Sequence, residues 1–202
     1  SKGMQSGGGR LTSYEAHRAI VWFSDVVDFS RHIVNLAPAR PADVVQRFFN
    51  AQSTPIAEHG GHIDKFMGDG LMAFWVLSES EAAMPKCLEA LKAAEGATKA
   101  VSEIQIGNQP LHLRVGLHIG SVLSGDFGST TRHQFTLIGP EVNKAARLEQ
   151  AHDNDVLGGT CPLGAIRLSA EFREELNGQM KKRYGHVAQV KAKNVGELEL
   201  YT

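Results

Sequence analysis

The sequence is poor in cysteine and has no long hydrophobic run, and both absences narrow the classes of protein to which it can belong. Only Cys87 and Cys161 occur among the 202 residues, and they form neither a CxxC motif nor a disulfide framework. No apolar stretch is long enough to span a bilayer, and no signal-peptide pattern opens the chain. We therefore expect a reducing, cytoplasmic setting and no membrane segment within this chain.

Neither sign of charge dominates, since 21 Lys and Arg residues stand against 22 Asp and Glu residues, for a net charge of −1. This balance argues against nucleic acid or an anionic membrane as a partner. Nine histidines raise the question of zinc. However, Gly60 and Gly61 separate His59 from His62, which disfavours helical spacing, and no further ligand completes a zinc pattern.

The chain is predicted to form one domain over residues 13–202, preceded by a glycine-rich stub or linker at 1–12. Strands are expected at 17–24, 62–67, 71–75, 111–119 and 135–138, and helices at 31–36, from Pro41 to Gly61, at 80–106 and at 141–151. A turn and a short strand are expected within 120–128, a short helix near 169–176, and strands near 184–190 and 197–201. This order predicts the α+β class, as a ferredoxin-like two-layer sandwich with a mostly antiparallel sheet and helices on one face.

Two apolar runs each carry an aspartate at or just after their end. Asp25 follows residues 20–24, and Asp69 follows residues 63–67 within a Gly-Asp-Gly turn. If the two strands pair, the carboxylates meet, and a hard divalent cation such as Mg²⁺ is the usual answer to their repulsion. Mg²⁺ held in this way generally acts on a phosphorylated substrate. The alternative is that Asp25 caps a helix and Asp69 only occupies a turn.

Four segments of the chain, taken together, resemble the catalytic domains of class III nucleotidyl cyclases, over about residues 17–202. They are FSDVVDFS at 23–30, KFMGD at 65–69, RVGLHIG at 114–120 and VNKAAR at 142–147. The resemblance is to bacterial adenylyl cyclases with a lysine/threonine pair. It implies a homodimer with two interface active sites, each of which converts a nucleoside triphosphate into a 3′,5′-cyclic monophosphate and pyrophosphate.

The resemblance also implies roles for individual residues at the metal and phosphate sites. Asp25, Asp69 and the carbonyl of Val26 would hold two Mg²⁺ or Mn²⁺ ions. The residues that would contact phosphate are Val27, Asp28, Phe29, Ser30, Arg114 and Lys193, with Lys191 as an alternative to Lys193. The family usually has glycine where Asp28 stands, and we expect the Asp28 side chain to point away from phosphate as a helix cap.

Asn143 and Arg147 lie four residues apart and therefore share a helix face. The resemblance assigns Asn143 to orienting the ribose and Arg147 to the charge that develops on the transferring phosphoryl group. The alternative is that Arg147 forms a surface ion pair with Glu149 or Glu141.

The resemblance assigns base choice to Lys65 and Thr136, which would reach a base held by the partner subunit's metals. A lysine donates to N1 of adenine and a threonine hydroxyl accepts from its 6-amino group, so ATP is the predicted substrate. Alternatively, Lys65 pairs with Asp64 or Asp69, and Thr136 is an ordinary strand residue. Guanylyl cyclase activity and a catalytically silent nucleotide-binding domain are the competing functions. An upstream regulatory domain is also expected in the full-length chain.

Overall fold

The computed structural model describes residues 14–33, 40–129, 132–159, 161–193 and 195–202. The predicted stub at 1–12 and the end of the predicted helix at 31–36 lie outside these residues. The elements are β1 (Glu15–Val26), α1 (Phe29–Ile33), α2 (Arg40–Glu58), β2 (His62–Met67), β3 (Gly70–Leu77), α3 (Ala83–Ser102), β4 (Gln105–Ile106), β5 (Gln109–Pro110), β6 (Leu113–Ser129), β7 (Arg132–Ile138), α4 (Pro140–Gln150), η1 (Asp153–Asp155), β8 (Ile166–Ser169), α5 (Ala170–Glu174), α6 (Gly178–Arg183), β9 (Val187–Ala192) and β10 (Gly196–Tyr201).

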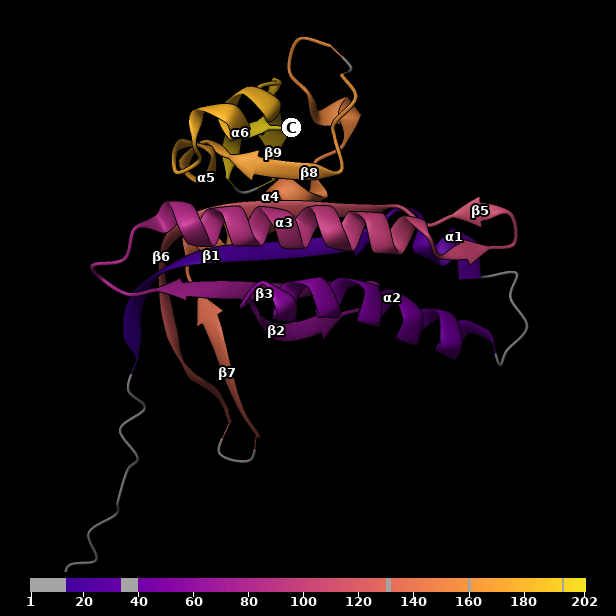
Figure 1. Cartoon of the computed structure of the whole chain (residues 1–202), viewed down its shortest axis with the longest axis horizontal. Coiled ribbons are helices and arrows are strands. Elements are labelled where there is room, and N and C mark those ends of the chain that lie inside the picture. Colours follow the sequence, from indigo (N-terminus) through magenta and orange to yellow (C-terminus); the bar gives the residue numbers. More distant parts are fainter. Residues whose placement is uncertain (1–13, 34–39, 130–131, 160, 194) are drawn as a thin grey trace, which may run out of the picture.

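The main sheet has the order β2-β3-β1-β6-β8-β10-β9, with β7 paired to β6. β6 and β8 run parallel, whereas the other strand pairs described are antiparallel. The predicted mixed α+β class with a mostly antiparallel sheet is therefore confirmed. In Figure 1, α2 and α3 lie side by side across one face of the sheet, and β6 and β7 extend beyond it as a long arm.

Two apolar clusters lie on opposite faces of the sheet, because successive side chains of a strand point to opposite faces. Ile20 and Trp22 of β1 pack with α2 and α3 in the larger cluster. Ala19 and Val21 pack with α4 in the smaller one. The helices were predicted to lie on one face of the sheet. That part of the prediction is wrong, because α4 covers the opposite face.

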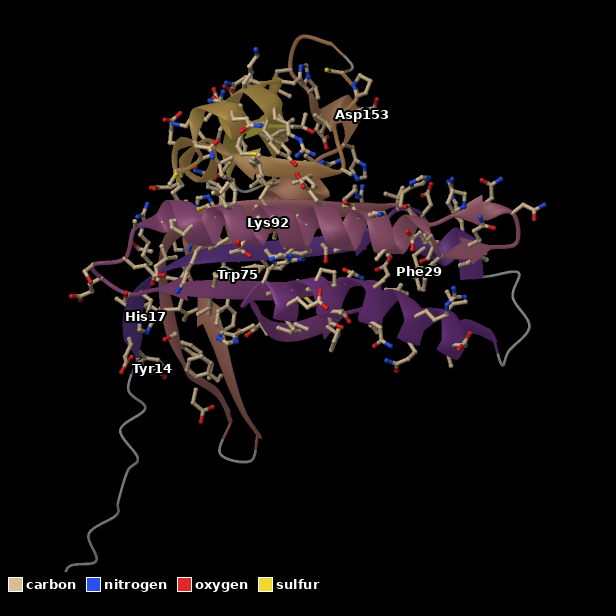
Figure 2. The ribbon with its side chains drawn as sticks, viewed as in Figure 1. Tyr14, His17, Phe29, Trp75, Lys92 and Asp153 are labelled. Carbon is tan, nitrogen blue, oxygen red and sulfur yellow. The ribbon has the colours of Figure 1, made fainter. Side chains whose placement is uncertain are left out.

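A tryptophan of β3 ties the main cluster to the end of α2. The Trp75 indole nitrogen donates to the carbonyl of His59 at 2.8 Å, and its ring lies 6.2 Å from that of Trp22 between centroids. Figure 2 labels the Trp75 side chain. Since the indole donor is satisfied, this ring is buried without the cost of an unpaired polar group. No helix among the described residues has the length and apolar character needed to cross a membrane.

Two strand predictions were wrong. The turn expected within 120–128 is absent, because β6 continues through it, with Gly120 paired to Ala19. A side chain at Gly120 would meet Glu141 of α4 at 2.7 Å, so this glycine serves close helix packing rather than a turn. The strand that ends before Asp69, β2, does not pair with β1, because β1 lies between β3 and β6 and β2 lies half-exposed at the edge of the sheet.

Candidate active site

The ends of three neighbouring strands bring Asp25, Asp69 and Arg114 together. Asp25 of β1 lies opposite Gly70 of β3 and opposite Arg114 of β6, and Asp69 immediately precedes Gly70. Arg114 Nη2 donates to Asp25 Oδ2 at 2.6 Å. Burial, and then the charge of Asp25, raise the pKa of the Asp69 carboxyl above its ordinary value. The two carboxylates thus share one electrostatic site, with a guanidinium as the positive group.

Gly70 is needed for this approach of β3 to β1. A Cβ at this position would lie 1.9 Å from the carbonyl oxygen of Ser24, which no side chain can tolerate. The second glycine of the Gly-Asp-Gly turn therefore allows close strand contact, and that contact places Asp69 beside Asp25.

Glu149 is a third carboxylate at this site, although from the sequence it is expected only as a partner of Arg147. Its side chain is 7% exposed, and Oε1 lies 3.6 Å from Arg114 Nε. Burial, and then the charge of Asp25, raise the pKa of Glu149 to about 7. Glu149 reaches the site because α4 packs directly on Gly116, where a Cβ would lie 2.6 Å from the carbonyl oxygen of Ala145. In the sequence, Glu149 is notable only because it lies two residues from Arg147. That spacing does not indicate a contact with Arg114.

A cavity of about 350 Å³ adjoins these carboxylates and is lined by Phe23, Ser24, Asp25, Met67, Arg114, Glu149, Gln150 and His152. A second hollow, of about 510 Å³, shares Arg114 and His152 with this cavity and is also lined by Val27, Asp153 and Arg167. Arg114 therefore borders both hollows.

Not every backbone amide of the predicted phosphate loop, residues 27–30, is free to bind phosphate. The Val27 amide donates to the carbonyl of His112 at 2.8 Å, so that amide already has an acceptor. Asp28 has a φ of 53°, in the left-handed region, which explains why a glycine is favourable at this position. Its carboxylate is exposed and lies 3.9 Å from Arg31, and its backbone carbonyl accepts from the Arg31 amide. The side chain thus faces Arg31, on the first turn of α1.

The predicted base-binding residues come together from strands that are far apart in sequence. Lys65 Nζ of β2 donates to Thr136 Oγ1 of β7 at 3.2 Å. Asp64 joins them, since its Oδ2 accepts from Thr136 Oγ1 at 2.8 Å and pairs with Lys65 Nζ at 3.1 Å. Lys65 therefore contacts both the predicted threonine and the aspartate that was its alternative partner.

The remaining predicted residues lie around α4 and β9. Arg147 lines a hollow of about 160 Å³ together with Lys191 and Lys193. Asn143 lines a different hollow of about 480 Å³. The ion pair considered for Arg147 is not the arrangement observed, because its guanidinium donates to Gln150.

Those alternative glutamate partners of Arg147 are engaged elsewhere. Glu149 contacts Arg114, and Glu141 contacts the buried His118. The structure therefore places Arg147 beside the two lysines and Glu149 beside Arg114.

The profile of the adenylate and guanylate cyclase catalytic domain matches residues 11–201. The chain belongs to this family. Adenylate cyclase 1 of Rhizobium meliloti is 29% identical over 211 aligned positions, which cover 97% of this chain and 31% of that protein. An uncharacterised protein of Mycobacterium tuberculosis is 29% identical over 193 positions, covering 93% of this chain and 34% of that protein. The cyclase domain thus spans about a third of the length of these curated relatives.

Solved structures of similar fold include both kinds of cyclase. The adenylyl cyclase CyaB from P. aeruginosa matches with a TM-score of 0.71 and 25% identity, over 94% of this chain and 95% of that one. The guanylyl cyclase Cya2 matches with a TM-score of 0.77 and 24% identity, over 93% of this chain and 91% of that one. The family and the fold are therefore established, and base specificity has to be argued from the site.

Proposed function

We propose that this domain is an adenylyl cyclase that converts ATP into 3′,5′-cyclic AMP and pyrophosphate at the interface of a homodimer. The observation that carries the choice of ATP is the contact between Lys65 and Thr136. An ammonium donor beside a hydroxyl acceptor matches N1 and the 6-amino group of adenine. Guanine offers a donor at N1 and an acceptor at O6, so it meets the wrong partner at both positions.

The metal site proposed consists of Asp25, Asp69 and the carbonyl of Val26. Hard oxygen donors suit Mg²⁺ and Mn²⁺. Burial, and then the charge of Asp25, raise the pKa of Asp69, and a cation between the two carboxylates would offset both effects. When bound, these ions would lower the pKa of the ribose 3′-hydroxyl and neutralise charge on the triphosphate.

The protein's own residues would bind and orient the substrate around that site. Arg114 borders the cavity beside Asp25 and is suited to the β- and γ-phosphates once the aspartate is engaged by cation. Lys191 and Lys193 line one hollow, and either can contribute a further phosphate contact. Asn143 is proposed to orient the ribose. Arg147, a planar donor that is always charged, is proposed to stabilise the phosphoryl group in transit.

The loop after β1 is proposed to contribute backbone amides to the phosphates. With the Val27 amide engaged by His112, the amides proposed for this role are those of Asp28, Phe29 and Ser30. The Asp28 carboxylate, which faces Arg31, need not oppose the substrate.

A second copy of the chain is proposed because two large apolar side chains on β2 and β7, each next in sequence to a base residue, are exposed. Phe66 and Phe135, which adjoin Lys65 and Thr136, are 52% and 60% exposed. Large apolar side chains that stay exposed on the strands of a proposed site are typical of a surface that another protein covers. A C₂ dimer would bury this surface and join the Lys65 side of one subunit to the Asp25 side of its partner.

The test is a competition between ATP and GTP with Mn²⁺, in which the cyclic product is identified by mass. We expect cyclic AMP to predominate by at least tenfold. Equal or greater turnover of GTP would instead indicate a guanylyl cyclase, and nucleotide binding without any cyclic product would indicate a silent domain. The retention of Asp25, Asp69 and Arg147 favours an active enzyme.

A further inference from the structure

We propose that Asp64 is a positioning residue that sets the purine preference, because it fixes the direction in which the Thr136 hydroxyl donates its proton. This inference rests on the proposed function, since it assumes that Lys65 and Thr136 meet the base. The new element is Asp64, which the backbone geometry of β2 places where it can affect base selectivity.

A β-bulge in β2 places Asp64 beside Lys65. Ile63 pairs with Ala73 and Lys65 pairs with Met72, so Asp64 is an extra residue between two residues whose partners are consecutive in β3. Successive side chains of a regular strand point to opposite faces, whereas a bulge re-aims one of them. The bulge therefore explains how two consecutive residues of one strand both contact Thr136.

The hydrogen bonds at Thr136 leave its hydroxyl only one way to meet a ligand. A hydroxyl has one proton and two lone pairs. The proton is donated to Asp64 Oδ2 at 2.8 Å, and one lone pair accepts from Lys65 Nζ at 3.2 Å. The remaining lone pair can only accept, so it suits the 6-amino group of adenine and not the O6 carbonyl of guanine.

Asp64 is well placed to maintain this direction. Its side chain is 0% exposed, so water does not compete for the carboxylate. Its Oδ1 is buried without a hydrogen-bond partner among the described residues, and this costs stability. Asp64 is therefore buried at a cost in stability, on a bulge and in contact with both base-binding side chains. A role in orienting the Thr136 hydroxyl explains this placement.

The test compares Asp64→Ala with the conservative Asp64→Asn. In Asp64→Ala the Thr136 hydroxyl is free to turn and donate to O6 of guanine, so the ratio of kcat/KM for ATP to that for GTP should fall about ten- to a hundredfold. Asp64→Asn keeps a carbonyl acceptor and should retain most of the selectivity. A purely structural role would lower both kcat/KM values together and leave their ratio unchanged.

Two further measurements separate orientation from catalysis and from folding. The 3′-deoxy forms of ATP and GTP cannot cyclise, so their inhibition constants report binding alone, and the same loss of preference should be seen there. Thr136→Val removes the hydroxyl, and in that background Asp64→Ala should change the ratio less than twofold. Melting temperatures identify any variant that fails to fold. If Asp64→Ala does not fold, Asp64→Asn is compared with the wild-type protein in its place.

The outcomes distinguish this inference from the proposed function. If the wild-type protein makes no cyclic AMP or prefers GTP, the proposed function fails. If the wild-type protein prefers ATP and Asp64→Ala retains that preference for substrates and for the 3′-deoxy inhibitors, the role of Asp64 is wrong while the function stands.

Discussion

Replacing Glu149 by Gln should make the metal-free cyclase domain more stable at neutral pH than the wild-type protein. The Glu149 carboxylate is almost fully buried, and its pKa is raised from 4.5 to about 7. Because the folded-state pKa is the higher one, the folded protein binds more protons than the unfolded chain between these two values. Wild-type stability therefore falls as the pH rises through this window.

The size of the effect follows from the difference between the two pKa values. At about 1.4 kcal/mol for each pH unit, the cost of ionising Glu149 reaches about 3 kcal/mol above pH 7. Glutamine has the same shape and no charge to bury. The variant should match the wild-type protein near pH 4.5 and exceed its stability by up to about 3 kcal/mol at pH 8.

Urea unfolding in EDTA at several pH values from 4.5 to 8 measures this difference. Glu197→Gln, which removes an exposed carboxylate from β10, is the matched control and should follow the pH dependence of the wild-type protein. If the stability of Glu149→Gln changed with pH in parallel with that of the wild-type protein, the environment assigned to Glu149 would be wrong.

Other predictions concern the metal site, the dimer and packing. Asp25→Ala and Asp69→Ala should each lower cyclic nucleotide formation at least about a hundredfold with the dimer intact by size-exclusion chromatography, and a near-normal rate in either would contradict the two-metal proposal. Removing divalent ions with EDTA should abolish activity, and Mn²⁺ should restore it; activity that persisted in EDTA would count against a metal requirement. Mixing Asp25→Ala with Arg147→Ala chains should recover part of the activity through one intact interface, and no recovery in demonstrated mixed dimers would argue against shared sites. Gly116→Ala should cost about 1–3 kcal/mol in urea unfolding, because its Cβ would lie 2.6 Å from the Ala145 carbonyl oxygen, and an unchanged midpoint would contradict the close packing of α4.

Several features of this protein follow from the sequence because they depend on neighbouring residues. The two apolar segments that flank the Gly-Asp-Gly turn predicted β2 and β3, and strands were also expected near β9 and β10. The helix predicted at 141–151 corresponds to α4. The order of the motifs indicated the family, and the family match agrees with it.

Features that depend on residues distant in the sequence were decided by the tertiary structure. The bulge that turns Asp64 toward Thr136 depends on how β2 pairs with β3 and on the position of β7. No local sequence pattern predicts it. The approach of Glu149 to Arg114 depends on α4 packing against a glycine of β6.

The physical reason is that local sequence governs backbone propensity and which side of an element is apolar. Which charges face each other depends on how closely the packed elements approach. In this domain those distances make Arg114 the counter-ion of Asp25 and turn two consecutive residues of β2 toward Thr136.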